Sequence, residues 1–199
     1  MIELARRRMM MGGSALPYDA EVEYLESTGT QYIDADVLLH STTAYNYSFE
    51  FKCYVPVQNH VSTIFNCMLE ESGYPGECIR YELTNNNVIQ YATNGVNTGQ
   101  TMTWNGPFSP NTTFVAIGGR KGTYTAHNTP TTIFASWRSN APFRFSKVKL
   151  YYFKLINKGV LVRDFIPVRK NGIGYMYDKV SRQLFGNQGT GQFIIGPDK

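Results

Sequence analysis

The chain lacks long apolar runs and has few cysteines. Nothing approaches the ~18 consecutive apolar residues of a membrane span. The N-terminal stretch "MIELARRRMMMGGSALPYDAE" is basic but lacks the apolar run of about 7–15 residues that a secretory signal peptide needs. The 3 cysteines, Cys53, Cys67 and Cys78, lack the short spacing of metal ligands. Because their number is odd, they do not indicate a disulfide framework. We therefore expect buried free thiols in a protein that is made in a reducing cytoplasm and does not associate with membranes.

The chain also has a small net charge and no helical periodicity after residue 20. The 19 basic and 15 acidic residues leave a net charge of +4 over 199 residues, with no concentrated basic face of the kind that binds nucleic acid. No segment of ten or more residues after residue 20 has a helical period. The histidines, His40, His60 and His127, are far apart in the sequence, and we expect them on the surface or in loops.

Aromatic and β-branched residues are plentiful, as is typical of β structure. In "YSFEFKCYV" apolar and polar residues alternate, which predicts a strand with one wet face. Its inward residues would be Tyr47, Phe49, Phe51, Cys53 and Val55. "IRYEL" repeats the pattern with Ile79, Tyr81 and Leu83 inward, and "KVKLYYFKLI" becomes apolar on both faces, which predicts a central strand.

Turn residues separate these segments. Lys158–Gly159 and Asn171–Gly172 predict tight antiparallel hairpins. Pro167 lies within an otherwise regular strand pattern and predicts an edge strand or a strand end there. Together the patterns predict an all-β jelly-roll sandwich of two antiparallel sheets over residues 21–199, with the sandwich itself running from about Glu21 to Pro197.

Residues 1–20 form a separate arm in this interpretation. Gly12, Gly13 and Ser14 break any helix and provide a hinge. We expect the arm to dock on a partner in a larger, homo-oligomeric assembly; the alternative is a frayed, solvated tail. The docking residues would be Ile2, Leu4, Arg6, Arg7, Arg8, Met9, Met10 and Met11, which combine adaptable apolar contacts with guanidinium groups for carboxylates.

The C-terminal stretch "YMYDKVSRQLFGNQGTGQF" contains Gly186, Gly189, Thr190 and Gly191, which resemble a phosphate-binding loop. However, no Lys follows, and "QFIIGPDK" alternates like a strand, so no helix N-terminus would hold an anion. We predict a structural turn, in which Asp178 bonds back to the amides near Val180 and Ser181.

Two segments carry a family resemblance. "EYLESTGTQYID" and "KLYYFKLINKGVLVRDFIPVRKNGIGYMYDKVSRQLFGNQGTGQF" resemble the concanavalin A-like lectin/glucanase (LamG-like) jelly-roll family, which is common in gut bacteria and in their phages and prophages. The resemblance covers residues 23–34 and about 145–193. It implies that the first strand and the C-terminal strands lie together and close the sandwich, and that the glycine-rich stretch is a turn.

Catalytic patterns are missing. Retaining glucanases of this fold carry two Glu flanking an Asp along one strand, at a spacing that sets the carboxylate separation. The nearest stretch, "EVEYLE", offers Glu21, Glu23 and Glu26 without the central Asp. We therefore expect no enzymatic activity and no catalytic residue. No metal or cofactor is predicted. Calcium binding stays an alternative, because Asp34 and Asp36 are two residues apart in "YIDADV" and offer oxygen ligands.

For glycan binding, the useful residues are exposed aromatic rings beside polar groups. Trp104 with Asn105, Tyr124, and Trp137 are the candidates, and both tryptophans look like loop residues between strands. The alternative is that each ring caps the end of the core or fills a subunit interface.

Two functions fit these features. The first is a non-enzymatic virion structural protein, such as a capsid decoration, head-fibre or tail-associated module. The arm would fix it to other virion proteins, and it could bind host or mucosal glycans. The free cysteines, the basic arm, the missing signal peptide and the phage character of the resemblance favour it. The second is a carbohydrate-binding lectin module of a gut bacterial surface or secreted protein, although fold alone does not imply function.

Overall fold

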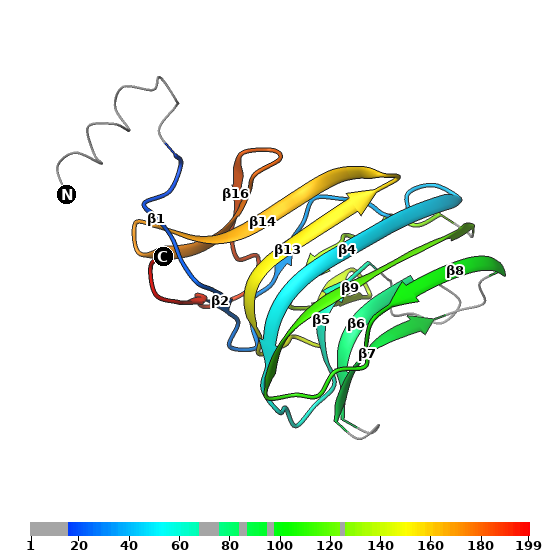
Figure 1. Ribbon diagram of the computed structural model, residues 1–199, viewed down its shortest axis with the longest axis horizontal. Helices are drawn as coiled ribbons and strands as arrows, with labels where there is room; N and C mark the ends of the chain where they lie inside the picture. The colour runs from blue at the N-terminus through cyan, green and yellow to red at the C-terminus, as the bar shows by residue number, and fades with distance from the viewer. Residues whose placement is uncertain (1–15, 68–75, 84–86, 95–97, 124–125) are drawn as a thin grey trace.

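The computed structural model describes residues 16–67, 76–83, 87–94, 98–123 and 126–199. This part of the chain contains strands and turns but no helix, and hence no helix that could span a membrane. Every strand pair in it is antiparallel, and all strands except one separate hairpin belong to two facing sheets (Figure 1). The prediction of an all-β sandwich is therefore confirmed, whereas the arm residues 1–15 lie outside the described residues.

The larger sheet has ten strands. Seven of them follow the order β16 (Gln183–Phe185), β15 (Ile173–Asp178), β14 (Val160–Lys170), β13 (Lys149–Asn157), β4 (Ala44–Val55), β9 (Thr112–Thr123) and β8 (Thr98–Trp104). The other three are short: β1 (Ala20–Glu21) pairs with β14, β2 (Leu25–Glu26) pairs with β13, and β17 (Ile194–Ile195) pairs with β2.

The smaller sheet has five strands and covers one face of the larger sheet. Its order is β3 (Ile33–Asp34), β10 (Thr132–Ile133), β5 (Ser62–Asn66), β6 (Gly76–Glu82) and β7 (Val88–Asn94). A separate hairpin is formed by β11 (Ser136–Arg138) and β12 (Ala141–Phe143).

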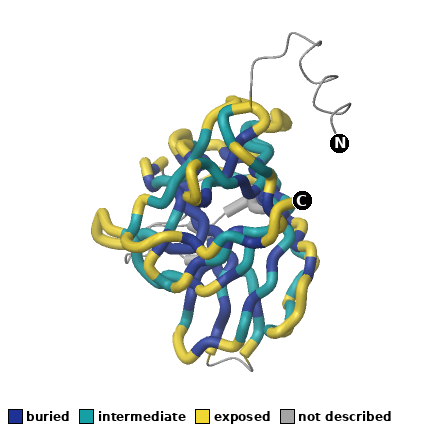
Figure 2. The backbone as a smooth tube through the Cα atoms, turned by 90° about the vertical axis from the view of Figure 1, so that its left-hand side faces the viewer, coloured by how far each residue is buried: buried dark blue, intermediate teal, exposed yellow. Residues whose placement is uncertain are grey.

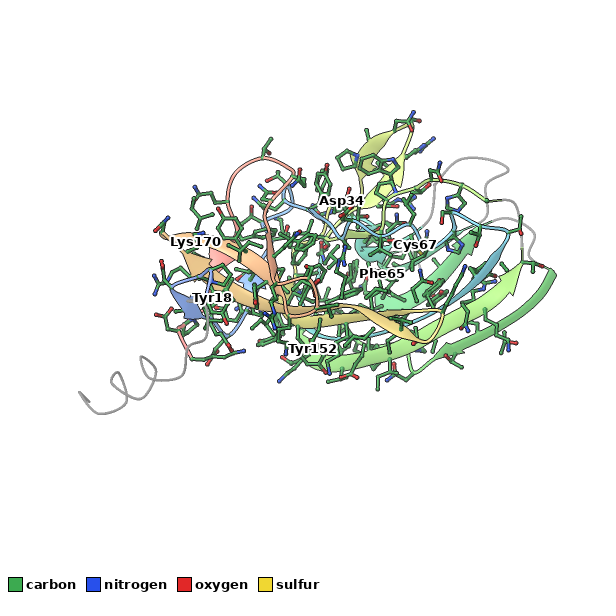
Figure 3. The ribbon with its side chains drawn as sticks, turned by 90° about the horizontal axis from the view of Figure 1, so that it is seen from above. Tyr18, Asp34, Phe65, Cys67, Tyr152 and Lys170 are labelled. Carbon is green, nitrogen blue, oxygen red and sulfur yellow. The ribbon has the colours of Figure 1, made fainter. Side chains whose placement is uncertain are left out.

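Aromatic rings fill the space between the sheets. Phe153 of β13 lies 5.2 Å from Phe65 of β5 and 5.9 Å from Phe51 of β4, measured between ring centroids. The five predicted inward residues of β4 are all buried. In Figure 3, Phe65 and Cys67 lie on one side of the larger sheet and Tyr152 on the other. Figure 2 shows that buried residues lie along the strands and that exposed residues lie mostly at the turns. The three cysteines are buried and free, as predicted.

The hairpin turns have the expected backbone. Lys158 and Gly159 have φ of 50° and 80°, and Asn171 and Gly172 have φ of 50° and 75°, which is the left-handed conformation that two-residue hairpin turns require. They join β13 to β14 and β14 to β15. Strand β13 lies between β4 and β14, so the prediction of a central position is confirmed.

Two local predictions are wrong. Pro167 lies inside β14, which has neighbours on both sides. On that side the pairing with β13 is last seen at Phe165, and the carbonyl of Pro167 accepts the amide of Val22 at 3.0 Å, next to the β1 pairing that begins at Val168. Proline can fill this place because it still offers a carbonyl acceptor. Leu83 was expected to face inward, but β6 ends at Glu82 and Leu83 is exposed.

The two ends of the described chain lie side by side at one end of the sandwich, here called the terminal pole (Figure 1). Val22 bridges Asp198, and the amide of Lys199 donates to the carbonyl of Glu21. Strand β8 lies at the opposite end. The predicted meeting of the chain ends in one sheet is confirmed.

The aromatic core predicts a large effect of removing its central ring. Phe153→Ala should lower the free energy of unfolding by about 3–5 kcal/mol, because it removes buried contacts and leaves a cavity. Urea denaturation followed by circular dichroism measures the change. Val160→Ala, at the exposed first residue of β14, should change it by less than about 0.5 kcal/mol. Equal effects of the two substitutions would contradict the central position of Phe153.

Candidate functional site

The glycine-rich stretch is bonded into the protein through its own backbone amides. The amides of Gln188 and Thr190 donate to the carbonyls of Tyr32 and Thr30, at 2.9 and 3.1 Å. The amide of Gly189 donates to Asn187 Oδ1 at 2.8 Å. A Cβ on Gly189 would lie 2.0 Å from the carbonyl oxygen of Thr30, so only glycine fits there. The amides of Gln188, Gly189 and Thr190 are thus already used within the protein, and the stretch acts as a turn.

Asp178 organises the preceding turn as predicted. Its carboxylate accepts from the amides of Val180 and Ser181, each at 3.1 Å, and from the amide of Asp164 at 2.8 Å. The guanidinium of Arg163 lies 3.7 Å away. Burial acts to raise the pKa of Asp178, but the hydrogen bonds from Asp164, Ser181 and Val180 outweigh it and hold that pKa below its usual value.

Arg163 connects this turn to the smaller sheet. Its Nε donates to the carbonyl of Ala35 at 2.7 Å and its Nη2 to the carbonyl of Asp36 at 2.9 Å, both just after β3. The ring of Phe185 lies beneath the guanidinium, 5.2 Å from its central carbon. These charged groups therefore hold the two sheets together, which is a structural role.

The carboxylates considered for calcium do not share a regular strand face. Strand β3 ends at Asp34, and Asp36 has φ of 51°. Asp34 Oδ1 accepts the amide of Asp36 at 2.8 Å, and Asp36 Oδ2 lies 3.9 Å from Arg163. Among the described residues, no group of three or more His, Cys, Asp or Glu could hold a metal ion. Oxygen ligands converging on a cation are thus not found in this segment.

The three glutamates near the start are also separated. Glu21 belongs to β1 and Glu26 to β2, with Glu23 exposed between them. Glu26 lies 3.8 Å from the ammonium of Lys149. The side chains therefore do not form a carboxylate row along one strand.

Trp104 is the last residue of β8, so its expected place in a loop is wrong. Its indole is partly buried against Phe108, Tyr91 and Phe49, with ring centroids 5.4, 6.0 and 6.1 Å away. The side chain of Asn105 extends the ladder, since its Oδ1 accepts the amide of Ile117 and its Nδ2 donates to the carbonyl of Val115. The indole of Trp104 thus closes the end of the core, and the exposed side chain of Asn105 is held against β9.

Trp137 also lies in a strand, β11, and not in a loop. Its half-buried ring lies 6.3 Å from that of Tyr32, which in turn contacts Phe145 at 6.2 Å. Burial, followed by the charge of Asp34, raises the pKa of Tyr32. Tyr124 lies outside the described residues.

Two histidines lie in loops, which is one of the two expected positions, but they are not on the surface. His40 and His127 are both buried and stack with ring centroids 5.0 Å apart. Tyr45 lies 4.8 Å from His40, edge to face. The pairing could not be read from the sequence because the two residues are distant along the chain. Only His60 is exposed as expected.

A groove on the outer face of the larger sheet was missed by the sequence interpretation. Its volume is about 310 Å³, and the residues that line it include Glu50, Tyr151, Tyr152, Lys154, Asp164 and Lys179. We call it the tyrosine groove. In a regular strand Tyr151 and Tyr152 would point to opposite faces.

A β-bulge explains why both tyrosines line one groove. The register of β13 against β4 shifts between Leu150, which faces Cys53, and Tyr152, which faces Lys52. Tyr151 is the extra residue, and such a bulge re-aims a side chain. The ammonium of Lys52 lies 5.1 Å from the centroid of the Tyr151 ring, which fixes that ring on the outer face. The only sequence signal would have been the pair of adjacent tyrosines in "KLYYFK".

Polar groups surround these rings. The hydroxyl of Tyr152 donates to Glu50 Oε1 at 2.8 Å, and Lys179 Nζ lies 3.1 Å from Asp164 Oδ2. Burial, then the hydrogen bond and charge of Glu50, raise the pKa of Tyr152 to about 12. Tyr152 therefore stays a neutral donor at physiological pH. The groove combines aromatic rings, carboxylate acceptors and ammonium donors, which suits a polar ligand with hydroxyl groups and an apolar face.

Comparison with known proteins gives no match among family models, curated proteins or solved structures. The geometry of the described residues therefore carries the functional argument.

Asp178 predicts a pH-dependent contribution to stability. Because its folded-state pKa is lowered, its contribution is complete above the unfolded pKa of about 3.9 and is lost as pH falls through the folded value. Asp178→Asn should cost about 2–3 kcal/mol at pH 7, by loss of hydrogen bonds to a charged acceptor. Thermal unfolding from pH 7 to pH 2 should show a flatter decline for the variant.

The matched control is Asp198→Asn. The hydrogen bond from Arg169 lowers the pKa of Asp198 as well, but this pair is exposed and screened by water. Its substitution should have a much smaller effect. A pH profile of Asp178→Asn parallel to that of the unmodified protein would contradict the role given to Asp178.

Proposed function

We propose that the protein is a non-enzymatic virion structural protein, a module that projects from a particle and is attached by its N-terminal arm. It decorates a capsid or belongs to a head fibre or tail, and its partners are other virion proteins. The observation that carries the proposal is the terminal pole. The first described residues and the last strand lie together there, so the segment that precedes residue 16 joins the sandwich at this end, opposite β8.

The contents of the described sandwich support a role without catalysis. The candidate glutamates are separated, and the charged cluster of Asp178 and Arg163 holds sheets and turns together. The buried free cysteines fit folding in a reducing bacterial cytoplasm before assembly. The resemblance to concanavalin A-like modules of phages and gut bacteria points the same way. Capsid, portal or tail genes beside the coding sequence would favour this proposal, and polysaccharide-use genes would favour a lectin.

A second function, glycan binding, is favoured by the tyrosine groove. Aromatic rings pack on the apolar faces of sugar rings, and Glu50 and Asp164 provide acceptors for hydroxyl groups. The sequence-predicted candidates fit less well, because Trp104 is packed into the core and the amide of Asn105 is bonded to β9. Trp137, half-buried beside Tyr32, is the alternative position. A virion protein with this groove would bind host or mucosal glycans, and a bacterial lectin would use the same surface.

The arm can be tested by deletion. Removal of residues 1–13 should leave the sandwich folded, with nearly unchanged thermal stability, because the described core begins after this segment. The truncated protein should not be incorporated into particles, as measured by mass spectrometry and electron microscopy of native assemblies. A full-length variant with Arg6, Arg7 and Arg8 changed to Glu separates docking from length, and it should be excluded too. Normal incorporation of the truncated protein would refute the anchor.

Glycan binding can be tested on an array of host and mucosal glycans, followed by calorimetry with the strongest binder. Tyr151→Ala should weaken binding about tenfold or more, because a stacking ring is an anchor of the contact. Trp137→Ala should leave the affinity unchanged. The reverse result would move the site to the β11–β12 hairpin, and an array that is blank for the unmodified protein would remove the glycan proposal.

A further inference from the structure

The charges of the tyrosine groove do not balance. Each of the two acidic side chains that line it already has an ammonium group beside it. Lys154 Nζ lies 4.0 Å from Glu50 Oε1, and Lys179 Nζ lies 3.1 Å from Asp164 Oδ2. A ligand in the groove therefore meets carboxylates whose negative charge is compensated by their neighbours.

Two further ammonium groups have no such partner. Lys52 lies next to the groove on β4, opposite Tyr152 in the pairing with β13, and its ammonium is 5.1 Å from the centroid of the Tyr151 ring. Lys199 lines the groove at the terminal pole. Within the part of the chain that the structure describes, neither lysine forms a salt bridge. The groove thus has an excess of positive charge.

Lys52 contrasts with Lys149 on the same face of the larger sheet. The ammonium of Lys149 also lies near tyrosine rings, 4.7 Å from that of Tyr24 and 5.8 Å from that of Tyr54. It is also 3.8 Å from Glu26, which compensates its charge. An aromatic ring attracts a cation through its quadrupole but carries no net charge. The charge of Lys52, which has only a ring beside it, is therefore available to a ligand.

We infer that the tyrosine groove takes an anionic sugar and that Lys52 binds its acidic group. This inference rests on the proposed glycan binding and specifies the class of glycan. The sugar ring packs beside Tyr151 and Tyr152. Its carboxylate or sulfate accepts from the ammonium of Lys52, a point charge on a flexible stem, and such charge-assisted hydrogen bonds are stronger than neutral ones. The net charge of +4 attracts a ligand of this kind.

The test uses pairs of oligosaccharides that differ in their acidic groups, titrated by calorimetry into the full chain. Sialylated and uronate-containing oligosaccharides are compared with their carboxyl-reduced forms, and sulfated ones with their unsulfated forms, which distinguishes the two acidic groups. The anionic member of at least one pair should bind about fivefold or more tightly than the neutral member. This preference should shrink as salt is added, because salt screens charges at a surface.

Substitutions separate the charge of Lys52 from its contact with the ring. Lys52→Gln should abolish the preference for the anionic member and leave the affinity for the neutral member unchanged. Lys52→Arg should retain the preference, because a guanidinium keeps both the charge and the contact with Tyr151.

Lys121→Gln is the matched control, because it removes the same charge from an exposed lysine on β9. Lys121 lies on the same face as Lys52, roughly 20 Å along β9 from the residue that pairs with Lys52. This variant should keep the preference of the unmodified protein.

Equal weakening of both members of a pair by Lys52→Gln would mean that Lys52 only holds the Tyr151 ring, and it would overturn the inference. Neutral glycans that bind as tightly as anionic ones would also overturn it, but they would leave the proposed glycan binding standing. A protein that binds no glycan at all loses both, so the two failures are distinguishable.

Discussion

The contact of Phe153 with Phe65 joins the two sheets and is the constraint on which the other features depend. Phe153 also contacts Phe51 and Phe165, with ring centroids 5.9 and 6.4 Å away, so one ring connects three strands of the larger sheet to the smaller one. Aromatic pairs add specific geometry to the burial of apolar area. Because these rings must face inward, the alternate residues of β4 and β13 must face outward, and the polar outer face follows from the apolar core.

The bulge at Tyr151 is where this strict alternation is relaxed. Without it, the tyrosine next to Tyr152 would compete with Phe153 for space between the sheets. With it, both tyrosines lie on the outer face beside Glu50 and Lys154, and the inward register resumes at Phe153. Apolar and polar residues do not alternate along the whole of β13. The bulge keeps the core residues of this strand facing inward in spite of that, and the groove is a consequence of the bulge.

The connections of the chain place the terminal pole and β8 at opposite ends of the larger sheet. Strands β1, β2 and β17 add to the larger sheet near β13 and β14 and gather the chain ends there, while β8 closes the same sheet at its far side. The outer face of the larger sheet, which carries the tyrosine groove, therefore lies between the terminal pole and β8. The charged pair of Asp178 and Arg163 supports this arrangement by tying the C-terminal turn to the start of the smaller sheet.

The sequence alone determined the fold class, the inward face of β4, and the two hairpin turns at Lys158–Gly159 and Asn171–Gly172. These depend on local rules, namely a two-residue period and residues that accept positive φ. It also determined the turn at Asp178, because the amides of Val180 and Ser181 that bond to its carboxylate lie within three residues. Tertiary structure decided everything that needs distant partners. It stacked His40 on His127, packed Trp104 into the core, and placed Pro167 in a strand interior. It also set the register shift that creates the tyrosine groove, because a bulge is fixed by the pairing of β13 with β4 and not by the residues of β13 alone.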